Sequence, residues 1–304
     1  MATTLPKFYL KFVGKYLFSS FTFARILTNM YTLTNKVVVI TGASSGIGKA
    51  LAETALQRGA KIAVCARNVE KLKSLFTASE QIFCFQADVS QETDCKAFME
   101  AVVARWGEID VLINNAGISM RAIFEDVDLA VIRELMDVNF WGAVYCTKYA
   151  LPLIMKNKGV IVGISSIAGN RGLPGRTGYS SSKFALQGFL ESLRTELLQT
   201  GVNVLWAAPG FTASNIRKVS RSSDGTAQAE SPLEENKLMT AEECARIIIG
   251  GIEKRKRTIV MTGQGKLVVW LNKLLPGVVD NLVYKHFMEE PGSPLKKYEG
   301  LSRK

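Results

Sequence analysis

The amino-acid sequence predicts an α/β fold, in which one parallel β-sheet is covered by helices on both faces. From Lys36 onward, short apolar runs alternate with helical patterns. The runs are apolar at every position, which is typical of strands buried on both faces, and repeated β-α-β units imply that the strands are parallel. The 304 residues, of which 47% are hydrophobic and 21% charged, suffice for a sizeable core and exclude a disordered or collagen-like chain.

The elements follow one another in a regular order as far as Pro209-Gly210. We predict strands at residues 37–40, 62–66, 82–85, 111–114, 160–165, 202–207 and 258–261, because each is a short apolar run. We predict helices at residues 46–58, 69–76, 93–106, 130–151, 180–198 and 241–256. Residues 212–240 are polar and too long for a plain connection, so we expect a lid or binding loop there.

Charge separates a nearly neutral body from two basic flanks. The formal net charge is +11, yet no acidic residue precedes Glu53, and residues 254–304 are again rich in Lys and Arg. A basic surplus outside the body points to an anionic membrane surface and argues against a nucleic-acid partner. We therefore divide the chain into a basic amphipathic segment at 1–31, a central domain at 32–262 and an apolar, basic extension at 263–304.

Both flanks have an apolar side that needs a partner. Lys7, Lys11 and Lys15 would share one stripe of a helix whose remaining surface is largely aromatic and aliphatic, a pattern typical of helices lying in a lipid interface. Packing on the chain's own domain or on a second subunit is the alternative. Residues 267–287, broken at Pro276-Gly277, fit a lipid surface or a dimer interface equally well. From Glu289 onward we expect the chain to fray.

Targeting signals and cysteine usage indicate the compartment. Charges interrupt the N-terminal apolar stretch, so no run is long enough to span a membrane, and no signal-peptide cleavage pattern follows it. The five cysteines are scattered, and His286 is the only histidine. This excludes a disulfide framework and argues against a metal site. We predict a cytoplasmic protein with reduced thiols, peripheral on a membrane at most and not secreted.

A glycine-rich turn joins the first strand to the first helix. Residues 41–48 read Thr-Gly-Ala-Ser-Ser-Gly-Ile-Gly. Glycines allow the backbone to approach a pyrophosphate, and the helix N-terminus supplies N–H groups and the positive end of a dipole. The spacing G-x-x-x-G-x-G differs from the common G-x-G-x-x-G fingerprint. A merely tight turn is the alternative interpretation.

The end of the second strand indicates which dinucleotide would bind. An NAD site uses a carboxylate about 20 residues beyond the glycines to bind the ribose hydroxyls, but Arg67 and Asn68 occupy this place. An arginine can hold a 2′-phosphate through charge-assisted hydrogen bonds. We therefore predict NADP(H), with a solvated surface arginine as the alternative.

A third pattern, Tyr179-x-x-x-Lys183, places two side chains on one face of a predicted helix. A free tyrosine has a pKa near 10, and a nearby ammonium should lower this pKa. Ser166 follows the predicted strand at 160–165, and such strand ends point toward the ligand crevice. Tyr179 is thus a candidate proton donor, although an ordinary half-buried aromatic remains the alternative.

Together these motifs resemble the short-chain dehydrogenase/reductase family. The resemblance rests on residues 41–48, Asp88, the Asn114-Asn115-Ala116-Gly117 run, Asn139, Ser166, Tyr179, Lys183 and Pro209-Gly210, and it covers about residues 33–262. It implies a single Rossmann domain with a doubly wound, seven-stranded parallel sheet that binds NADP(H), flanked by the two extensions. It also implies a homodimer or homotetramer, in which helices such as residues 180–198 pair.

The resemblance assigns roles to individual residues. It implies that Ser166, Tyr179, Lys183 and Asn139 are catalytic. The cofactor would contact Thr41, Gly42, Ser44, Ser45, Gly46, Ile47, Gly48, Arg67, Asn68, Asp88, Val89, Asn115, Ala116, Gly117, Tyr179, Lys183, Pro209, Gly210 and Thr212. The assignment of Thr212 to the nicotinamide carboxamide is the least direct, because residues 209–212 are shifted from the common family pattern.

The implied reaction is reduction of a ketone or aldehyde to an alcohol by hydride from NADPH. Ser166 would stabilise the carbonyl oxygen, Tyr179 would protonate it, and Lys183 would lower the tyrosine pKa and orient the nicotinamide ribose. Asn139 would hold a water that passes protons to Lys183. The runs at 114–121, 164–169 and 269–277 resemble a membrane-associated branch related to acyl/alkyl-dihydroxyacetone-phosphate reductase, so we expect a lipid-like carbonyl substrate.

Two other functions remain open at this point. The chain could be a soluble reductase or alcohol dehydrogenase for small carbonyls, whose flanks only dimerise. It could also be a scaffold that binds NADP(H) without turnover, although the complete catalytic set argues against this.

Overall fold

The computed structural model describes residues 30–77, 79–213, 216–228 and 238–301. Residues 31–304 form one compact unit. The predicted amphipathic helix at the N-terminus lies outside the described residues. Among the described residues, no helix has both the length and the apolar character needed to cross a membrane.

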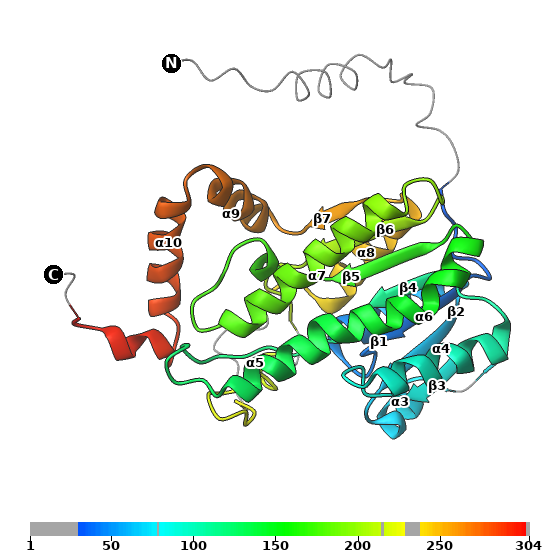
Figure 1. The fold of residues 1–304 in the computed structure, drawn as a ribbon, viewed down its shortest axis with the longest axis horizontal. Helices are drawn as coiled ribbons and strands as arrows, with labels where there is room; N and C mark the ends of the chain where they lie inside the picture. The colour runs from blue at the N-terminus through cyan, green and yellow to red at the C-terminus, as the bar shows by residue number, and fades with distance from the viewer. Residues whose placement is uncertain (1–29, 78, 214–215, 229–237, 302–304) are drawn as a thin grey trace, which may run out of the picture. The chain divides into compact units, whose positions relative to one another are not determined.

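A seven-stranded sheet forms the centre of this unit (Figure 1). Its strands are β1 (Val37–Thr41), β2 (Lys61–Ala66), β3 (Ile82–Gln86), β4 (Val111–Asn114), β5 (Val160–Ile164), β6 (Asn203–Ala208) and β7 (Thr258–Val260). The spatial order is β3-β2-β1-β4-β5-β6-β7, and every pairing is parallel. The doubly wound, all-parallel sheet that the sequence predicts is confirmed.

Helices cover both faces of the sheet, and each face has its own core. On one face, α2 (Gly46–Gln57), α3 (Val69–Leu75) and α8 (Ala241–Glu253) pack over alternate strand residues such as Val38 and Ile40. On the other, α4 (Glu92–Trp106), α6 (Gly142–Lys156) and α7 (Thr177–Glu196) pack over residues such as Val39. Because successive side chains of a strand point to opposite faces, a strand with both faces covered must be apolar throughout.

The single helix predicted at 130–151 is wrong. The segment forms α5 (Leu129–Met136), a π-helical turn (Asp137–Trp141) and α6, which continues past Pro152 to Lys156. A π-turn inserts an extra residue into the helical ladder, and such turns are frequent at functional sites. Here the turn contains Asn139.

The C-terminal extension forms two further helices, α9 (Gly263–Leu274) and α10 (Pro276–Met288), and a short 3₁₀ helix at Pro294–Tyr298. The expected break falls at Leu275, which directly precedes Pro276, because the residue before a proline disfavours the helical conformation. The expectation that the chain frays from Glu289 is wrong. Leu295 joins Phe287 and Ile123 in a small buried cluster, which fixes this segment to the loop that follows β4.

Candidate active site

A cavity of about 580 Å³ lies where the carboxyl ends of the strands meet. Its wall contains residues that directly follow β1, β2, β3, β4, β5 and β6. Of the predicted site residues, the wall includes Gly42, Ser44, Ser45, Gly46, Ile47, Gly48, Arg67, Asn68, Asp88, Val89, Asn115, Ala116, Gly117, Ser166, Tyr179, Lys183, Pro209, Gly210 and Thr212. In open α/β sheets, ligands bind in this crevice.

The N-terminus of α2 presents backbone N–H groups to the cavity. Ser45, its N-cap residue, makes no side-chain capping hydrogen bond, and the first turn contains no acidic residue. The preceding turn needs glycine, because Gly42 and Gly46 have φ values of 68° and 53°. Unsatisfied donors at the positive end of a helix favour a bound anion. The residues present therefore fit the pyrophosphate of a dinucleotide.

Thr41 lies behind the wall rather than in it. Its side-chain oxygen is buried and accepts hydrogen bonds from the backbone N–H groups of Asn115 and Ala116, both at 3.0 Å. The Asn115 amide in turn donates to the carbonyl oxygens of Thr41 and Gly42, at 2.9 and 3.1 Å. These bonds tie the glycine-rich turn to the turn after β4. Thr41 thus braces the site without facing its ligand.

The end of β2 contributes positive charge to the wall. Arg67 is exposed and lines the cavity together with Lys71, a residue that the sequence analysis missed. Asn68 caps α3 by accepting the backbone N–H of Lys71 at 2.9 Å. Among the described residues of the wall, Asp88 supplies the one carboxylate, and its Oδ1 accepts hydrogen bonds from the backbone and hydroxyl of Ser90.

Tyr179, Ser166 and Lys183 meet in the wall of the cavity. α7 begins at Thr177, so Tyr179 lies in its first turn and Lys183 one turn later. The Tyr179 hydroxyl hydrogen-bonds Ser166, which follows β5. The Lys183 ammonium lies 5.8 Å from the centre of the Tyr179 ring and donates to the carbonyl of Ile164 at 3.0 Å. Helix α7 and strand β5 thus bring the three side chains together.

The expectation that Lys183 lowers the tyrosine pKa is wrong for this structure. Burial raises the pKa of Tyr179 above 10.0, and this effect outweighs the hydrogen bond from Ser166 and the charges of Arg176 and Arg217, which lower the pKa. Burial also lowers the pKa of Lys183 from 10.5 to about 8. The phenol is therefore protonated at neutral pH, as a proton donor must be.

Asn139 is buried and faces Ile118 rather than the cavity. Its amide oxygen accepts the backbone N–H of Ile118 at 2.8 Å, and its amide nitrogen donates to the Ile118 carbonyl and the Ser182 hydroxyl, both at 2.9 Å. A Cβ added to Gly117 would lie 3.1 Å from this amide oxygen and 3.2 Å from the Lys183 nitrogen. The π-turn therefore fixes the loop after β4 next to Lys183.

The wall also contains residues that the sequence analysis did not assign to the site. They include Ile118, Leu173, Arg176, Phe211, Ile216 and Val219. Leu173 and Arg176 belong to the loop before α7, whose path over the site no local pattern reveals. Arg176 stands three residues before Tyr179, at the N-cap of the same helix. This proximity in sequence is the one feature from which its place in the site could have been predicted.

The described part of the long loop at 212–240 contributes residues from Thr212 to Arg221 to the cavity wall. Thr212 pairs with Met239, and Arg221 pairs with Met120 in a short bridge. The Arg221 guanidinium binds Glu134 of α5 at 2.5 and 2.8 Å, and Arg217 donates to the Thr212 carbonyl at 2.8 Å. These contacts tie the loop to α5 and to the segment that follows β4.

The fold and this site define a dinucleotide-binding oxidoreductase. A family model described as short chain dehydrogenase matches residues 36–225. The chain is 34% identical over 259 residues to 11-beta-hydroxysteroid dehydrogenase-like 2 of Arabidopsis thaliana, covering 83% of this chain and 81% of that protein. The chain thus belongs to the short-chain dehydrogenase/reductase family, whose members bind NAD or NADP and act on CH–OH groups.

Solved structures agree on the fold. A short-chain dehydrogenase/reductase from Burkholderia phymatum, in complex with NAD, has a TM-score of 0.73 at 21% identity and covers 82% of this chain and 96% of its own. A short chain dehydrogenase from Burkholderia cenocepacia, in complex with NADP, has a TM-score of 0.71 at 22% identity. The match covers 83% of this chain and 99% of that chain. The same fold therefore serves either cofactor.

Proposed function

We propose that the protein is a reductase that uses NADPH to convert a ketone or aldehyde on a lipophilic substrate to an alcohol. The observation that carries this proposal is the meeting of Ser166, Tyr179 and Lys183 at one cavity, with a phenol that is protonated at neutral pH. When bound, the dinucleotide supplies the hydride. The chain's own groups must bind the carbonyl, polarise it and protonate its oxygen.

The contacts indicate the role of each side chain in the reaction. The Ser166 hydroxyl lies beside the Tyr179 hydroxyl, so both can hydrogen-bond one carbonyl oxygen and stabilise the charge that develops there. Tyr179 then donates its proton to this oxygen. Lys183, held by its hydrogen bond to the Ile164 carbonyl, would orient the nicotinamide ribose. Asn139 holds the loop after β4 next to Lys183 and so keeps these side chains in position.

Charge at the end of β2 supports NADPH over NADH. Arg67 and Lys71 line the cavity and would bind a 2′-phosphate, and the residues directly after β2 include no carboxylate to accept bonds from a free ribose hydroxyl. A guanidinium and an ammonium bind a phosphate through charge-assisted hydrogen bonds. The NADP(H) preference thus rests on these two side chains.

Apolar side chains in the cavity wall support a lipophilic substrate. They include Leu173, Phe211, Ile216 and Val219, and apolar walls favour apolar ligands. The Arabidopsis relative bears the name of a dehydrogenase for hydroxysteroids, which are lipophilic alcohols. We include in this proposal that the chain belongs to the membrane-associated branch related to acyl/alkyl-dihydroxyacetone-phosphate reductase.

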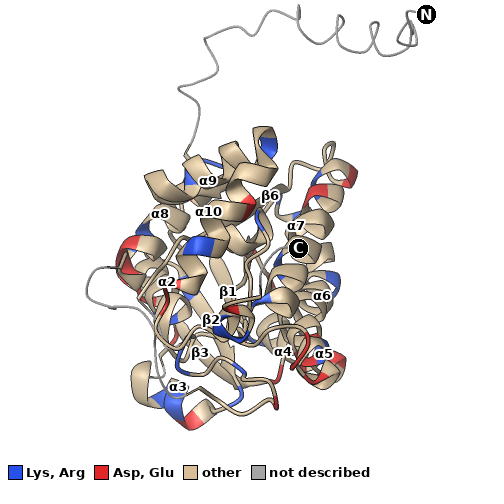
Figure 2. Cartoon of the chain, turned by 90° about the vertical axis from the view of Figure 1, so that its left-hand side faces the viewer, with Lys and Arg blue, Asp and Glu red and all other residues tan. Residues whose placement is uncertain are grey.

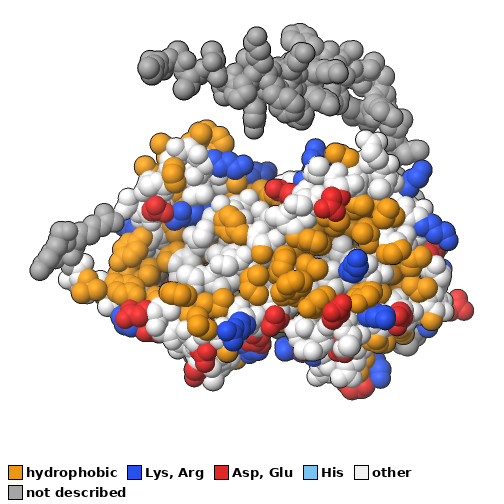
Figure 3. All heavy atoms as spheres, viewed as in Figure 1, with side chains coloured by type: hydrophobic (Ala, Val, Ile, Leu, Met, Phe, Trp, Pro, Cys, Tyr) orange, Lys and Arg blue, Asp and Glu red, His pale blue; other side chains and the backbone are white. Residues whose placement is uncertain are grey.

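We further propose that the protein works on an anionic membrane surface and as a homodimer or homotetramer. Exposed apolar side chains extend along α9 and α10, and the lysines of these helices lie beside them (Figures 2 and 3). A second set of exposed apolar residues, Trp141, Met155, Phe184 and Leu198, lies on α6, α7 and the turns next to them. The first surface suits lipid and the second suits another copy of the chain.

The test is oxidation of NADPH and NADH, as paired donors, with long-chain ketones and small polar carbonyls as acceptors. We expect turnover with NADPH and the lipophilic ketones. Tyr179→Phe should lower kcat about 10²–10⁴-fold, the usual contribution of a general acid. Tyr149→Phe makes the same chemical change at a hydroxyl that binds Glu92 outside the site, and it should leave kcat unchanged.

Three outcomes would count against the proposal. Full activity of the Tyr179→Phe variant would refute the proton-transfer role. Turnover restricted to small polar carbonyls would favour the soluble reductase. Binding of NADPH without turnover of any carbonyl would favour the scaffold.

A further inference from the structure

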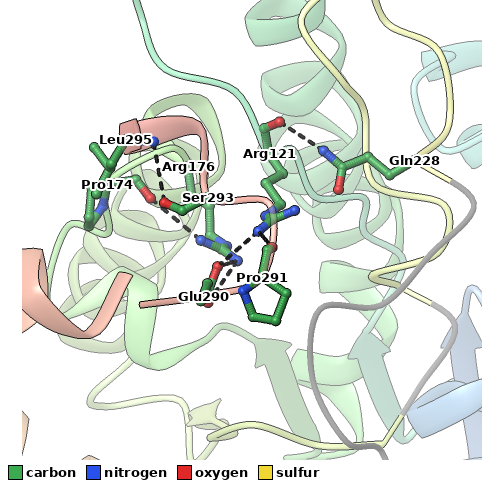
Figure 4. Close-up of polar contacts among 8 residues, drawn as sticks. All are labelled: Arg121, Pro174, Arg176, Gln228, Glu290, Pro291, Ser293 and Leu295. Atoms are coloured by element: carbon green, nitrogen blue, oxygen red, sulfur yellow. Dashed lines mark hydrogen bonds and ion pairs between the residues drawn. The ribbon is translucent and has the colours of Figure 1, made fainter. Parts of the chain in front are cut away.

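The C-terminal segment contributes a buried carboxylate next to the active-site cavity. Glu290, two residues beyond α10, has a side chain only 3% exposed. Its carboxylate contacts the Arg176 guanidinium at 3.3 and 3.4 Å and that of Arg121 at 3.5 Å. Figure 4 shows the two arginines approaching Glu290 from different loops. Buried charges persist only when they are paired in this way.

Each arginine has further contacts that tie the C-terminal segment to the body. Arg121 follows β4 and donates to the Pro291 carbonyl at 2.5 Å, while Gln228 donates to the Arg121 carbonyl at 2.8 Å. The guanidinium of Arg176 lies 4.6 Å from the centre of the Phe287 ring, at the end of α10. These contacts (Figure 4 shows the polar ones) hold residues 287–295 against two loops of the site.

Of the three charged groups, Arg176 is the one that reaches the cavity. It lines the cavity wall that also contains Tyr179, and it is the N-cap residue of the helix that carries Tyr179. Its side chain is only 12% exposed, so solvent screens its charge weakly. We propose that Glu290 is a positioning residue for the reaction, which holds the Arg176 guanidinium in the cavity wall beside Tyr179. This inference rests on the proposed function.

One polar group and three charged groups face Tyr179 from the elements around it. They are Ser166 after β5, Lys183 on the same helix, Arg176 before it and Arg217 from the loop after β6. The Arg176 charge lowers the pKa of Tyr179, and Glu290 partly neutralises that charge. Because a reductase needs the protonated phenol, its kcat/KM must fall as the pH rises through the pKa of Tyr179.

The proposal therefore makes two opposite predictions for the alkaline limb of the kcat/KM profile with NADPH. In Glu290→Gln, the amide oxygen still accepts a hydrogen bond from Arg176 and keeps it in the wall, but the negative charge is lost. The less neutralised Arg176 then favours the phenolate, so the limb should move to lower pH by about half a unit or more. In Arg176→Met, loss of the cation should move it to higher pH. The double variant should match Arg176→Met, because Glu290 acts through Arg176.

Asp280→Asn is the matched control. It makes the same carboxylate-to-amide change in the same segment, where Asp280 binds Arg171 at 2.5 Å with 62% of its side chain exposed. The pH profile of its kcat/KM should match that of the wild type. A Glu290→Gln variant that is less stable but has an unmoved alkaline limb would reduce Glu290 to a structural role and overturn the proposal.

A difference in the alkaline limb between the double variant and Arg176→Met would also overturn the proposal, since Glu290 would then act on the site directly. If Glu290→Gln does not fold, Arg176→Met still decides the question, because an unmoved limb there contradicts the proposal. Absence of turnover in the wild type would instead defeat the proposed function. The two failures are therefore distinguishable.

Discussion

At the scale of single residues, burial controls the chemistry of the site more than neighbouring charges do. Tyr179 and Lys183 lie one helical turn apart, and that spacing suggests mutual adjustment of their pKa values. In the structure, desolvation is the largest influence on both groups. It disfavours the charged form of each, so it raises the pKa of the phenol and lowers that of the ammonium. The residue types were predictable, but the depth of their burial was not.

Lys183 makes stability depend on pH in a predictable direction. Below about pH 8 both the folded and the unfolded chain carry the proton, and folding must bury it. Between pH 8 and 10.5 the unfolded chain binds more protons than the folded chain, so this contribution to stability rises with pH. The free energy of unfolding of the wild type relative to Lys183→Met should thus increase by about 3 kcal/mol over this range.

Urea unfolding of the cofactor-free protein at pH 7 and pH 10 measures this difference. Lys148→Met, which changes an exposed lysine of α6, serves as the control, and its stability should follow that of the wild type at both pH values. A difference between Lys183→Met and the wild type that stays constant with pH would contradict the assignment of a depressed pKa to this lysine.

At the scale of elements, the site is positioned by the close packing of α7 on β5. Gly163 lies in the middle of β5, and a Cβ added there would come within 2.3 Å of the Leu190 side chain. Leu190 is fully buried on α7, so it has little room to move. The glycine allows the helix that carries Tyr179 and Lys183 to approach the strand that ends at Ser166.

Gly163→Val should therefore destabilise the protein by about 1–3 kcal/mol, the usual cost of overpacking a core. Gly188→Ala is the matched control, because a Cβ at this position of α7 meets no atom within 4 Å. It should raise stability by up to about 1 kcal/mol through helix propensity. Thermal or urea unfolding measures both effects. Equal stability of Gly163→Val and the wild type would show that α7 can shift.

The strands and most helices could be predicted because their pattern is local. An apolar run or a helical period needs only neighbouring residues. The π-turn at Asn139 and the burial of Glu290 could not be predicted in this way. The first sits where a buried amide bonds Ile118 and Ser182, and the second requires Arg121 and Arg176, which are far away in the sequence. For the site, the motifs were visible, but Leu173 and Arg176 enter it through a loop whose path is set by tertiary contacts.

At the scale of the whole molecule, the most distinctive surface is the apolar stripe of the C-terminal extension. It consists of Leu267, Trp270, Leu274, Leu275, Val278 and Leu282, each more than half exposed. Lys266, Lys273 and Lys285 are exposed on the same two helices, and their one carboxylate, Asp280, is paired with Arg171. Apolar groups flanked by net positive charge match an anionic lipid interface.

Vesicles that contain anionic lipid should therefore carry the protein upward in a flotation gradient at low salt, and less of it at high salt. Replacing Trp270 and Leu274 by Glu should reduce the bound fraction several-fold, because it removes apolar area and adds repulsive charge. Leu129→Glu changes an exposed apolar residue at the start of α5, outside both proposed surfaces, and should leave flotation unchanged. Protein that stays with the buffer at low salt would contradict the membrane proposal.

The distribution of the thiols has a practical consequence. Cys65, Cys95, Cys146 and Cys244 are fully enclosed by the two cores, whereas Cys84 on β3 is only partly covered. Burial raises the pKa values of Cys65, Cys84 and Cys244, and a hydrogen bond with Cys95 together with burial raises that of Cys146. Thiolates are the reactive form. An alkylating reagent would thus tag the native molecule slowly at one position and the remaining four only as the core opens. The labelling rate of these four buried thiols would therefore report how fast the native core opens.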